Sequence, residues 1–500
     1  MLAAHTLYSP SQVAKLDAAA VEAGVSLQTL VYVAGTRAAE AIHARWPTKA
    51  IVVLCGPGNN GADGWIAAQH LRTLGHKVRI RIVAPIENAN AQVQWAASLW
   101  PENVQPNDDC DVQPDELVVD ALFGTGLKQA LSPVLQQWAL HIQALGVPVC
   151  ALDIASGVNG ATGAVEGQAF KATLTLSFLC AKPGHYLLPG REYTGELQVL
   201  TLPFPFALWQ RVETDTAWRQ RLGSVTQLNS PALWGAQFPV AGMAGHKYTR
   251  GHASVVGGEQ LTGAARLAAM AAQRSGAGLI SVVASAQAWS VYATALPSSI
   301  MVQSVEPTEW QQALLDERQN TWLVGPGAGV TEHTKQCVLQ ILQAKKSVVL
   351  DADAITVFKG QAALLAQTIA SPCVITPHEG EFARLFTRSA DKLQDVVNAA
   401  QQTGAVVVLK GADTVIAAPD GRVAINANAP AYLATGGSGD VLAGIVCGLL
   451  SQGMPAFEAA CAAVWMHGEA AQQCGVGLVP EDLIAALPMV QRHLLQSLQG

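Results

Sequence analysis

Short β-branched runs alternate with alanine-rich stretches of helical length along most of this chain. In the first 200 residues the runs are AIVVLCG (50–56), KVRIRIV (77–83), ELVVDALFG (116–124) and VPVCALDI (147–154). Alternation of this kind predicts parallel strands that are joined by crossover helices. We therefore expect an α/β fold class, and the opening segment SPSQVAKLDAAAVEAG (9–24) is typical of a capped amphipathic helix on the sheet.

The alternation stops between about 202 and 245 and then starts again. That interval holds prolines, tryptophans and glycines with little periodicity, which is typical of a boundary. From HASVVGG (252–258) onward, strand-like and helix-like stretches alternate to the end. Because domains commonly hold roughly 100 to 200 residues, 500 residues fit two α/β domains. We place them at 1–215 and 225–500.

Composition excludes several classes of protein. Charged residues make up 13% of the chain, against about 25% in average domains, and no window has the roughly 18 uninterrupted apolar residues of a membrane span. The start of the chain lacks the pattern of an export signal, and the nine cysteines form no Cys-x-x-Cys pair. The net charge of −7 shows no basic patch for nucleic acid. We expect a cytoplasmic protein with no membrane or nucleic-acid partner, and the low charge content favours a homo-oligomer.

A glycine cluster follows the first apolar strand. The segment VVLCGPGNNGADG (52–64) runs from a strand into glycines and then into a helix, where backbone amides can hold an anion. The segments VVDALFGTGLKQA (118–130) and ALDIASGVNG (151–160) also end an apolar strand with an aspartate and small residues. In a parallel sheet these three loops converge on one edge.

Side-chain oxygens at this edge suit a cation and a proton transfer. Asn60, Asp120 and Ser156, together with backbone carbonyls, form a set of hard oxygen ligands. Asp153 could serve as a proton-transfer group. Each aspartate taken alone is equally well explained as a helix cap or a turn former.

A second glycine cluster, ATGGSGDVLAGI (434–445), leads into an apolar helix. Its glycines expose backbone N–H groups where the helix start concentrates positive charge, which favours a bound phosphate. Asp440 beside that phosphate makes sense if its carboxylate accepts a hydroxyl proton as a phosphoryl group arrives. Upstream, in VVVLKGADTVIAAPDG (406–421), Lys410 can meet a phosphate and Thr414 a phosphate or a ribose hydroxyl. A strand-end lysine is as often only an exposed charge.

These motifs resemble two known families. GPGNNGADG, VVDALFGTGL and DIASGV look like the signature loops of the YjeF N-terminal family, the NAD(P)HX epimerases, over residues 8 to 210. Lys-Gly-x-x-Thr followed by Gly-Ser-Gly-Asp resembles the ribokinase-like superfamily. ITPHEGEFARLF (375–386) and VGPGAGV (324–330) narrow this to its YjeF C-terminal branch, the NAD(P)HX dehydratases, over 225 to 500. The resemblance implies two three-layer α/β domains, the first Rossmann-like and the second ribokinase-like.

The first resemblance implies a substrate site and a potassium site in the N-terminal domain. Potassium would be held by Asn60, Asp120 and Ser156. Hydrated NADH and NADPH (NADHX and NADPHX) would be bound by Asn59, Asn60, Gly61, Ala62, Asp63, Gly124, Thr125, Gly126, Leu127, Lys128, Gln129, Ala130 and Asp153, with Asp153 catalytic.

The sequence departs from the epimerase pattern in three places. Ala62 stands where the family usually has Gly, and Ala155 stands where it usually has Pro. LVYVAG (30–35) replaces a segment that usually contains a Glu-Asn pair. An N-terminal domain that binds the nucleotide as a scaffold, without catalysis, is therefore kept as an alternative to an epimerase.

The second resemblance implies an ADP-dependent dehydration in the C-terminal domain. The hydroxyl at C6 of the hydrated nicotinamide ring would be phosphorylated, with Asp440 as catalytic base, and loss of phosphate would restore NAD(P)H. Magnesium would arrive with ADP, AMP would be released, and the assembly would be a tetramer or larger. The hydrated cofactor would contact Ala265, Gly327, His378 and Asp440, and the adenine nucleotide would contact Lys410, Gly411, Ala412, Asp413, Thr414 and Gly439.

The alternative for this domain keeps the fold and changes the substrate. A ribokinase-like enzyme could instead phosphorylate a small alcohol, such as a thiazole or pyrimidine vitamin precursor. The chain has no Walker-type Gly-x-x-x-x-Gly-Lys-Ser, so a P-loop ATPase is excluded.

Overall fold

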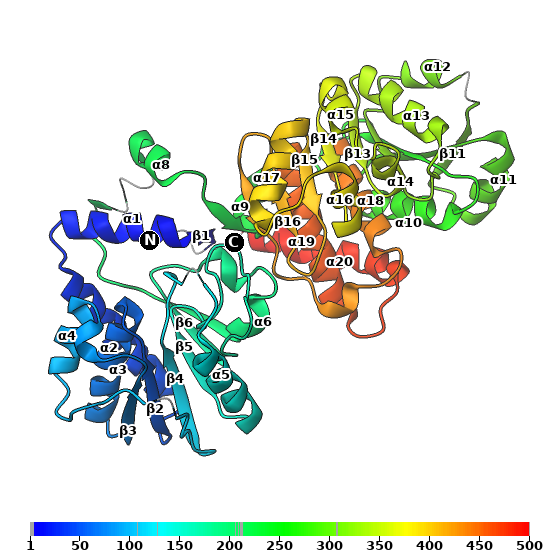
Figure 1. Cartoon of the computed structure of the whole chain (residues 1–500). Helices are drawn as coiled ribbons and strands as arrows, with labels where there is room; N and C mark the ends of the chain where they lie inside the picture. Colours follow the sequence, from blue (N-terminus) through cyan, green and yellow to red (C-terminus); the bar gives the residue numbers. More distant parts are fainter. Residues whose placement is uncertain are drawn as a thin grey trace. The chain divides into compact units, whose positions relative to one another are not determined.

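The computed structural model (Figure 1) divides into two compact units, Met1–Thr226 and Gln227–Gly500. It describes residues 5–107, 109–127, 129–205, 207–208, 210, 214–306 and 309–499. Each unit contains a mainly parallel sheet with helices against it, so the predicted fold class is confirmed. The domain limits 1–215 and 225–500 stay predictions.

The sheet of the N-terminal unit is parallel throughout and has the strand order β3-β2-β4-β5-β6-β7. The chain passes from β2 to β3 on one side and then returns to β4 on the other side of β2. This reversal opens a crevice beyond the carboxyl ends of β2 and β4, where ligands bind in such sheets. The strands are β2 (Ala50–Cys55), β3 (Val78–Ile82), β4 (Glu116–Ala121), β5 (Val149–Leu152), β6 (Leu174–Phe178) and β7 (Glu196–Leu200).

Helices cover both faces of this sheet. One apolar core joins the sheet to α2 (Leu27–Arg45), α3 (Asn59–Thr73) and α4 (Ala91–Ser98), and another joins it to α5 (Pro133–Leu145). The α2 and α3 backbones approach closely, because a Cβ built on Gly35 would lie 2.7 Å from the Asp63 carbonyl oxygen. The remaining elements are β1 (Thr6–Leu7), η1 (Ile86–Asn88), η2 (Pro183–His185), α6 (Arg191–Thr194) and α8 (Thr216–Leu222).

The first helix begins and packs as the sequence predicts. α1 (Pro10–Glu22) starts with a capping box, in which Ser9 and Gln12 satisfy each other's backbone N–H groups. Its buried Leu16 belongs to a small apolar cluster with Leu179 from the end of β6. Helix α1 therefore lies against the carboxyl end of the sheet, where it helps to close the ligand-binding edge.

The sheet of the C-terminal unit runs β8-β17-β16-β15-β14-β13-β12-β9-β10-β11. Strands from β15 to β11 are parallel, and β15, β16 and β17 form an antiparallel meander. The strands are β8 (Thr226–Leu228), β9 (His252–Val256), β10 (Leu279–Ala284), β11 (Met301–Ser304), β12 (Thr321–Val324), β13 (Ser347–Leu350), β14 (Cys373–Ile375), β15 (Val406–Leu409), β16 (Val415–Ala417) and β17 (Val423–Ile425).

The helix after the second glycine cluster lies at the centre of the C-terminal core. Residues 441–451 of α18 (Ser438–Ser451) are buried, and α18 packs tightly on α10 (Thr262–Arg274). A Cβ on Gly444 would lie 2.2 Å from the Ala268 carbonyl oxygen, so only glycine permits this approach. α19 (Ala456–Cys474) and α20 (Pro480–Gln499) complete this core.

Other helices of this unit, among them α13 and α17, contact the sheet or border its strands. They are α9 (Pro231–Trp234), η3 (Gly235–Gln237), α11 (Ala286–Ala295), α12 (Trp310–Leu314), α13 (Glu332–Gln343), α14 (Asp353–Thr356), α15 (Ala362–Thr368), α16 (Glu379–Leu385), α17 (Lys392–Thr403) and η4 (Ala431–Leu433).

Within the described ranges, no single helix is long and apolar enough to cross a membrane. α1 and α2 meet that test of length and composition only as a pair, across a bend of 119°.

Candidate functional sites

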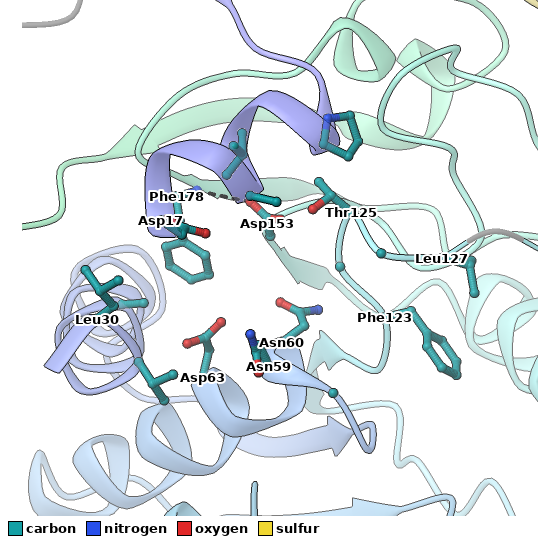
Figure 2. A pocket seen from close by; sticks show the side chains of 18 of the residues that line it. Asp17, Leu30, Asn59, Asn60, Asp63, Phe123, Thr125, Leu127, Asp153 and Phe178 are labelled. Carbon is teal, nitrogen blue, oxygen red and sulfur yellow. Dashed lines mark hydrogen bonds between the residues drawn. The ribbon is translucent and has the colours of Figure 1, made fainter. Parts of the chain in front are cut away.

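A cavity of about 790 Å³ opens at the carboxyl edge of the N-terminal sheet (Figure 2). Its walls come from α1, α2, the start of α3 and the loops after β4 and β5. The predicted residues that line it are Asn59, Asn60, Asp63, Gly124, Thr125, Gly126, Leu127, Gln129 and Asp153.

Two of the three predicted cation ligands, Asp120 and Ser156, are bonded to each other, and the third, Asn60, lines the cavity. Asp120 is fully buried at the end of β4 and accepts hydrogen bonds from the Ser156 N–H (2.8 Å) and the Ser156 hydroxyl (2.6 Å). Burial raises the pKa of Asp120 to about 6, although the bonds from Ser156 oppose that shift. The amide of Asn60 is buried, and its Oδ1 and Nδ2 have no hydrogen-bond partner in the described part of the chain. Unsatisfied buried oxygen is what a bound cation would use.

Asp153 is held as a carboxylate by a buried lysine. Its backbone lies in the left-handed region at φ 65°, a strained conformation for a residue other than glycine. The Lys182 side chain is fully buried, and its ammonium group donates to Asp153 Oδ1 and, at 2.9 Å, to the Ser177 hydroxyl. Burial alone would raise the pKa of Asp153, but Lys182 outweighs it and lowers that pKa below its usual range.

His185 supports the same arrangement. Its Nδ1 accepts from the Lys182 backbone N–H at 3.1 Å, and its Nε2 lies 3.0 Å from the Asp153 carbonyl oxygen. Burial and the nearby Lys182 charge lower the pKa of His185 to about 3, so the ring is neutral and its Nε2–H donates. Lys182 and His185 thereby fix both the side chain and the backbone of Asp153.

Two further carboxyl groups reach the cavity from opposite helices. Asp17 points into it from α1 and Asp63 from α3 (Figure 2). Burial, followed by the charge of Asp153, raises the pKa of Asp17 to about 6. The same two causes, with Asp17 in addition, raise the pKa of Asp63 well above its usual value. Asp17 was not predicted from the sequence. Its only sequence signal is that it follows Val13 by one helical turn, on the face of α1 that otherwise turns apolar side chains inward.

Three predicted N-terminal residues do not line the cavity, and one lies outside the described residues. Gly61 lets the start of α3 pack against Gly56, since a Cβ on Gly61 would lie 1.9 Å from the Gly56 carbonyl oxygen. Ala62 is fully buried in the core with α2. Ala130 is also absent from the lining, and Lys128 lies outside the described residues.

The departure at LVYVAG falls mostly outside the cavity. Leu30, Val31 and Ala34 line it, whereas Tyr32 is 53% exposed and, like Val33, does not. The residues that stand where the family has its Glu-Asn pair are therefore not in the wall. Asp17 of α1 supplies an acid to the wall of the same cavity.

In the C-terminal unit, Asp440 lies in the first turn of α18, directly after the glycine loop. Gly437 caps that helix at φ 91°, and a Cβ on Gly436 would meet nothing within 4 Å, so the loop backbone is accessible. Burial, followed by the charge of Asp351, raises the pKa of Asp440 to about 6. A base of that pKa is better matched to proton transfer at neutral pH than an ordinary carboxylate.

Lys410 connects the predicted nucleotide loop to Asp440. Its ammonium group lies 2.6 Å from Asp351 Oδ1 and 3.3 Å from the place a Gly439 Cβ would occupy. Burial lowers the pKa of Lys410, but Asp351 outweighs it and raises that pKa. Lys410 is therefore a fixed cation beside the glycine loop. Asp351 directly follows β13 and was not assigned a role from the sequence.

The turn between β15 and β16 is closed by its own side chains. Thr414 Oγ1 donates to the Gly411 carbonyl (2.7 Å) and accepts from the Gly411 N–H (3.1 Å). Asp413 forms an ion pair with Lys392 at 2.6 Å. Ala412 lies in the same turn. This loop is held rigid beside Lys410, and its nucleotide role stays a prediction.

His378 caps α16 next to the same loop. Its Nδ1 accepts from the Gly380 N–H at 2.9 Å, and its backbone pairs with that of Lys410. The side chain is 55% exposed. The structure thus brings His378, Lys410 and Gly439 to one edge with Asp440.

A second cavity, of about 560 Å³, opens at the carboxyl ends of β9, β10 and β12. Gly327 and Asp353 line it, and Asp353 also contributes to the raised pKa of Asp440. Ala265, which belongs to α10, does not line this cavity and is fully buried in the core. Among the described residues, no group of three or more His, Cys, Asp or Glu could hold a metal ion.

Two parallel α/β units, each with a glycine-rich ligand edge and an acid beside a lysine, define a two-domain enzyme. Residues 27–184 match the family model described as YjeF-related protein N-terminus, and residues 253–488 match the model described as NAD(P)H-hydrate dehydratase. Bifunctional NAD(P)H-hydrate repair enzymes of Thermosynechococcus vestitus and Escherichia coli are each 31% identical to the chain. The alignments cover 98% of both proteins for the first and 97% and 94% for the second.

The chain belongs to the family of bifunctional NAD(P)H-hydrate repair enzymes, and it carries both domains of that family. A crystal structure of the Bacillus subtilis ADP/ATP-dependent NAD(P)H-hydrate dehydratase, co-crystallised with ATP and Mg²⁺, is similar to it at 30% identity. That match covers 53% of this chain and 98% of the other, with a TM-score of 0.47.

Proposed function

We propose that this chain repairs hydrated NADH and NADPH in two steps. The N-terminal unit interconverts the R and S epimers of NADHX and NADPHX, and the C-terminal unit dehydrates the S epimer with ADP, releasing AMP and phosphate. The main support is the environment of Asp440, which has a raised pKa and lies in the first turn of α18 beside Lys410. Membership of the family supports it.

The dehydration follows from the groups at that edge. Asp440 accepts the proton of the C6 hydroxyl while the hydroxyl oxygen attacks the terminal phosphorus of ADP. The bond between that phosphorus and AMP breaks. The amides of the glycine loop and Lys410 stabilise the charge on the phosphoryl group in flight. The ring nitrogen then expels phosphate from C6, and a proton leaves C5. The double bond of the 1,4-dihydronicotinamide is thereby restored.

The donor set at Asn60, Asp120 and Ser156 fits potassium, because Asn60 has an unsatisfied buried amide oxygen and Asp120 has a buried carboxylate bonded to Ser156. When bound, the ion would supply positive charge beside an anionic substrate. Magnesium would arrive with the nucleotide phosphates rather than in a protein cage.

The remaining expectations are part of this proposal. ADP is the expected donor, and ATP is the alternative to be compared with it. The nine cysteines are free thiols, which supports work in the reducing cytoplasm. A tetramer or larger assembly would be tested by light scattering.

A spectroscopic assay tests the function. The chain is incubated with S-NADHX, ADP and Mg²⁺, and the absorbance of the reduced nicotinamide is followed, with a reaction lacking nucleotide as control. Recovery of the absorbance only with nucleotide is expected. No recovery, together with phosphorylation of a thiazole or pyrimidine alcohol, would show that the domain is a small-alcohol kinase.

A further inference from the structure

Asp17 and Asp63 face the N-terminal cavity without the partners that buried acids usually have. Neither carboxyl group takes part in a hydrogen bond or an ion pair with any residue that the structure describes, and the Asp63 side chain belongs to a residue only 8% exposed. Because neither carboxyl group is engaged by a partner within the described part of the chain, both are available to a molecule bound in the cavity. Figure 2 shows both pointing into the cavity, one from α1 and one from α3.

Exchange between the R and S epimers, that is, their interconversion, needs an acid and a base near C6 of the hydrated ring. C6 of the hydrated ring carries a hydroxyl next to the ring nitrogen. Protonation of that hydroxyl lets the nitrogen lone pair expel it as water, which leaves a C=N⁺ bond. Water then adds to the other face and gives up a proton, so one proton is consumed and one is released. A carboxylic acid on one side and a carboxylate on the other perform both transfers.

Asp153 does not suit the role of the acid. Lys182 forms an ion pair with the Asp153 carboxylate and lowers its pKa, so Asp153 remains charged at neutral pH. A fixed negative charge at this position stabilises the C=N⁺ ring that forms between the two transfers. The proton donor and acceptor must then be other groups in the wall.

We propose that Asp17 is a proton-transfer residue of the epimerisation, acting with Asp63 across the cavity while Asp153 remains a fixed carboxylate. This inference rests on the proposed epimerase function. The two unpaired carboxyl groups share the cavity with Asp153, and their mutual repulsion favours a state in which the pair holds one proton. Such a pair can exchange roles between the two directions of the reaction.

The surroundings of Asp17 favour this state. The charge of Asp153 raises the pKa of Asp17 and that of Lys182 lowers it, while Asp17 in turn raises the pKa of Asp63. The wall next to it is apolar, with Leu30 of α2 and Phe178 at the end of β6 (Figure 2). Low polarity near the carboxyl groups keeps one of them neutral.

The test is the Asp17→Asn variant of the full chain, with Glu22→Gln on the exposed end of the same helix as matched control. Exchange between purified R- and S-NADHX is measured from pH 5 to 8. The ADP-dependent dehydration of S-NADHX by the same chain serves as internal reference. We expect exchange to fall at least about 100-fold in D17N, while dehydration and the E22Q variant stay at the wild-type rate.

The pH profile separates a proton-transfer role from a structural one. In the wild type, exchange should rise as pH increases through about 6, because the pair must lose one of its two protons to supply a base. D17N should lose that rise, and Asp17→Glu, which keeps the carboxyl group, should retain it with slower exchange.

Unchanged exchange in D17N, or a residual rate with the wild-type pH profile, would overturn the assignment of Asp17. If circular dichroism shows that D17N does not fold, a D17E variant that folds but gives no exchange would also overturn the assignment of Asp17. Absence of exchange in the wild type would instead overturn the proposed epimerase function itself.

Discussion

The two candidate centres combine an aspartate and a lysine in different ways. In the N-terminal unit, Lys182 bonds directly to Asp153 and lowers the pKa of that carboxyl group. In the C-terminal unit, Lys410 bonds to Asp351, and Asp440 beside it has a pKa raised to about 6. A lysine that pairs with the acid fixes its charge, whereas a lysine that pairs with a neighbour leaves the acid able to take up a proton. The first arrangement suits charge stabilisation and the second suits a general base.

The largest effect is expected from removing the base of the C-terminal centre. Asp440→Asn should lower dehydration by about 10³-fold, because the hydroxyl loses its proton acceptor at phosphoryl transfer. Epimer exchange should be unchanged, since it uses the other unit. Stopped assays of both activities check this, with Asp420→Asn, on the exposed β16–β17 hairpin, as control. Full dehydration by D440N would contradict the assignment.

Removal of Lys182 should affect stability as well as exchange. Lys182→Met leaves Asp153 buried without its partner, which costs about 3–5 kcal/mol in the free energy of unfolding. Denaturant unfolding of the variant, followed with its exchange rate, measures this. A variant as stable as the wild type would show that the pair does not hold the first centre together.

The pH dependence of dehydration reports the pKa of Asp440. Asp440 must be ionised to accept a proton, so the rate should fall about tenfold per pH unit below a pKa of about 6 and be level above it. Lys410 lowers the pKa of Asp440, so Lys410→Met should move the midpoint to higher pH. Initial rates at saturating ADP from pH 5 to 8 test this. A midpoint near 4 would mean that the environment does not raise the pKa.

The smallest effect concerns the glycine loop. Gly437 has φ 91°, and a Cβ there would lie 2.9 Å from the Leu267 and Pro480 side chains, so Gly437→Ala should destabilise the chain by about 1–3 kcal/mol. Gly436→Ala, where a Cβ meets nothing within 4 Å, should be nearly neutral in stability. Thermal unfolding of both variants checks the difference. Equal midpoints would show that the loop adapts.

Sequence reasoning anticipated the elements and loops better than the electrostatics. The strand runs and glycine turns predicted both sheets and the capped helix α1, because periodicity and turn chemistry are local. Asp17 and Lys182 were missed because each lies far along the chain from the glycine loops, and only the fold brings them to the cavity. The raised pKa of Asp440 depends on its burial and on Asp351, which no motif reports.

One chain should contain both repair steps. The most direct measurement supplies the full-length wild type with pure R-NADHX, ADP and Mg²⁺ and follows the absorbance of reduced nicotinamide. Complete recovery is predicted, faster than R-NADHX changes on its own, and it should fall to that uncatalysed rate when Asp153 and Asp17 are both replaced by Asn. If the wild type recovers the S epimer but leaves the R epimer at the uncatalysed rate, the N-terminal unit is not an epimerase and the chain performs only the dehydration.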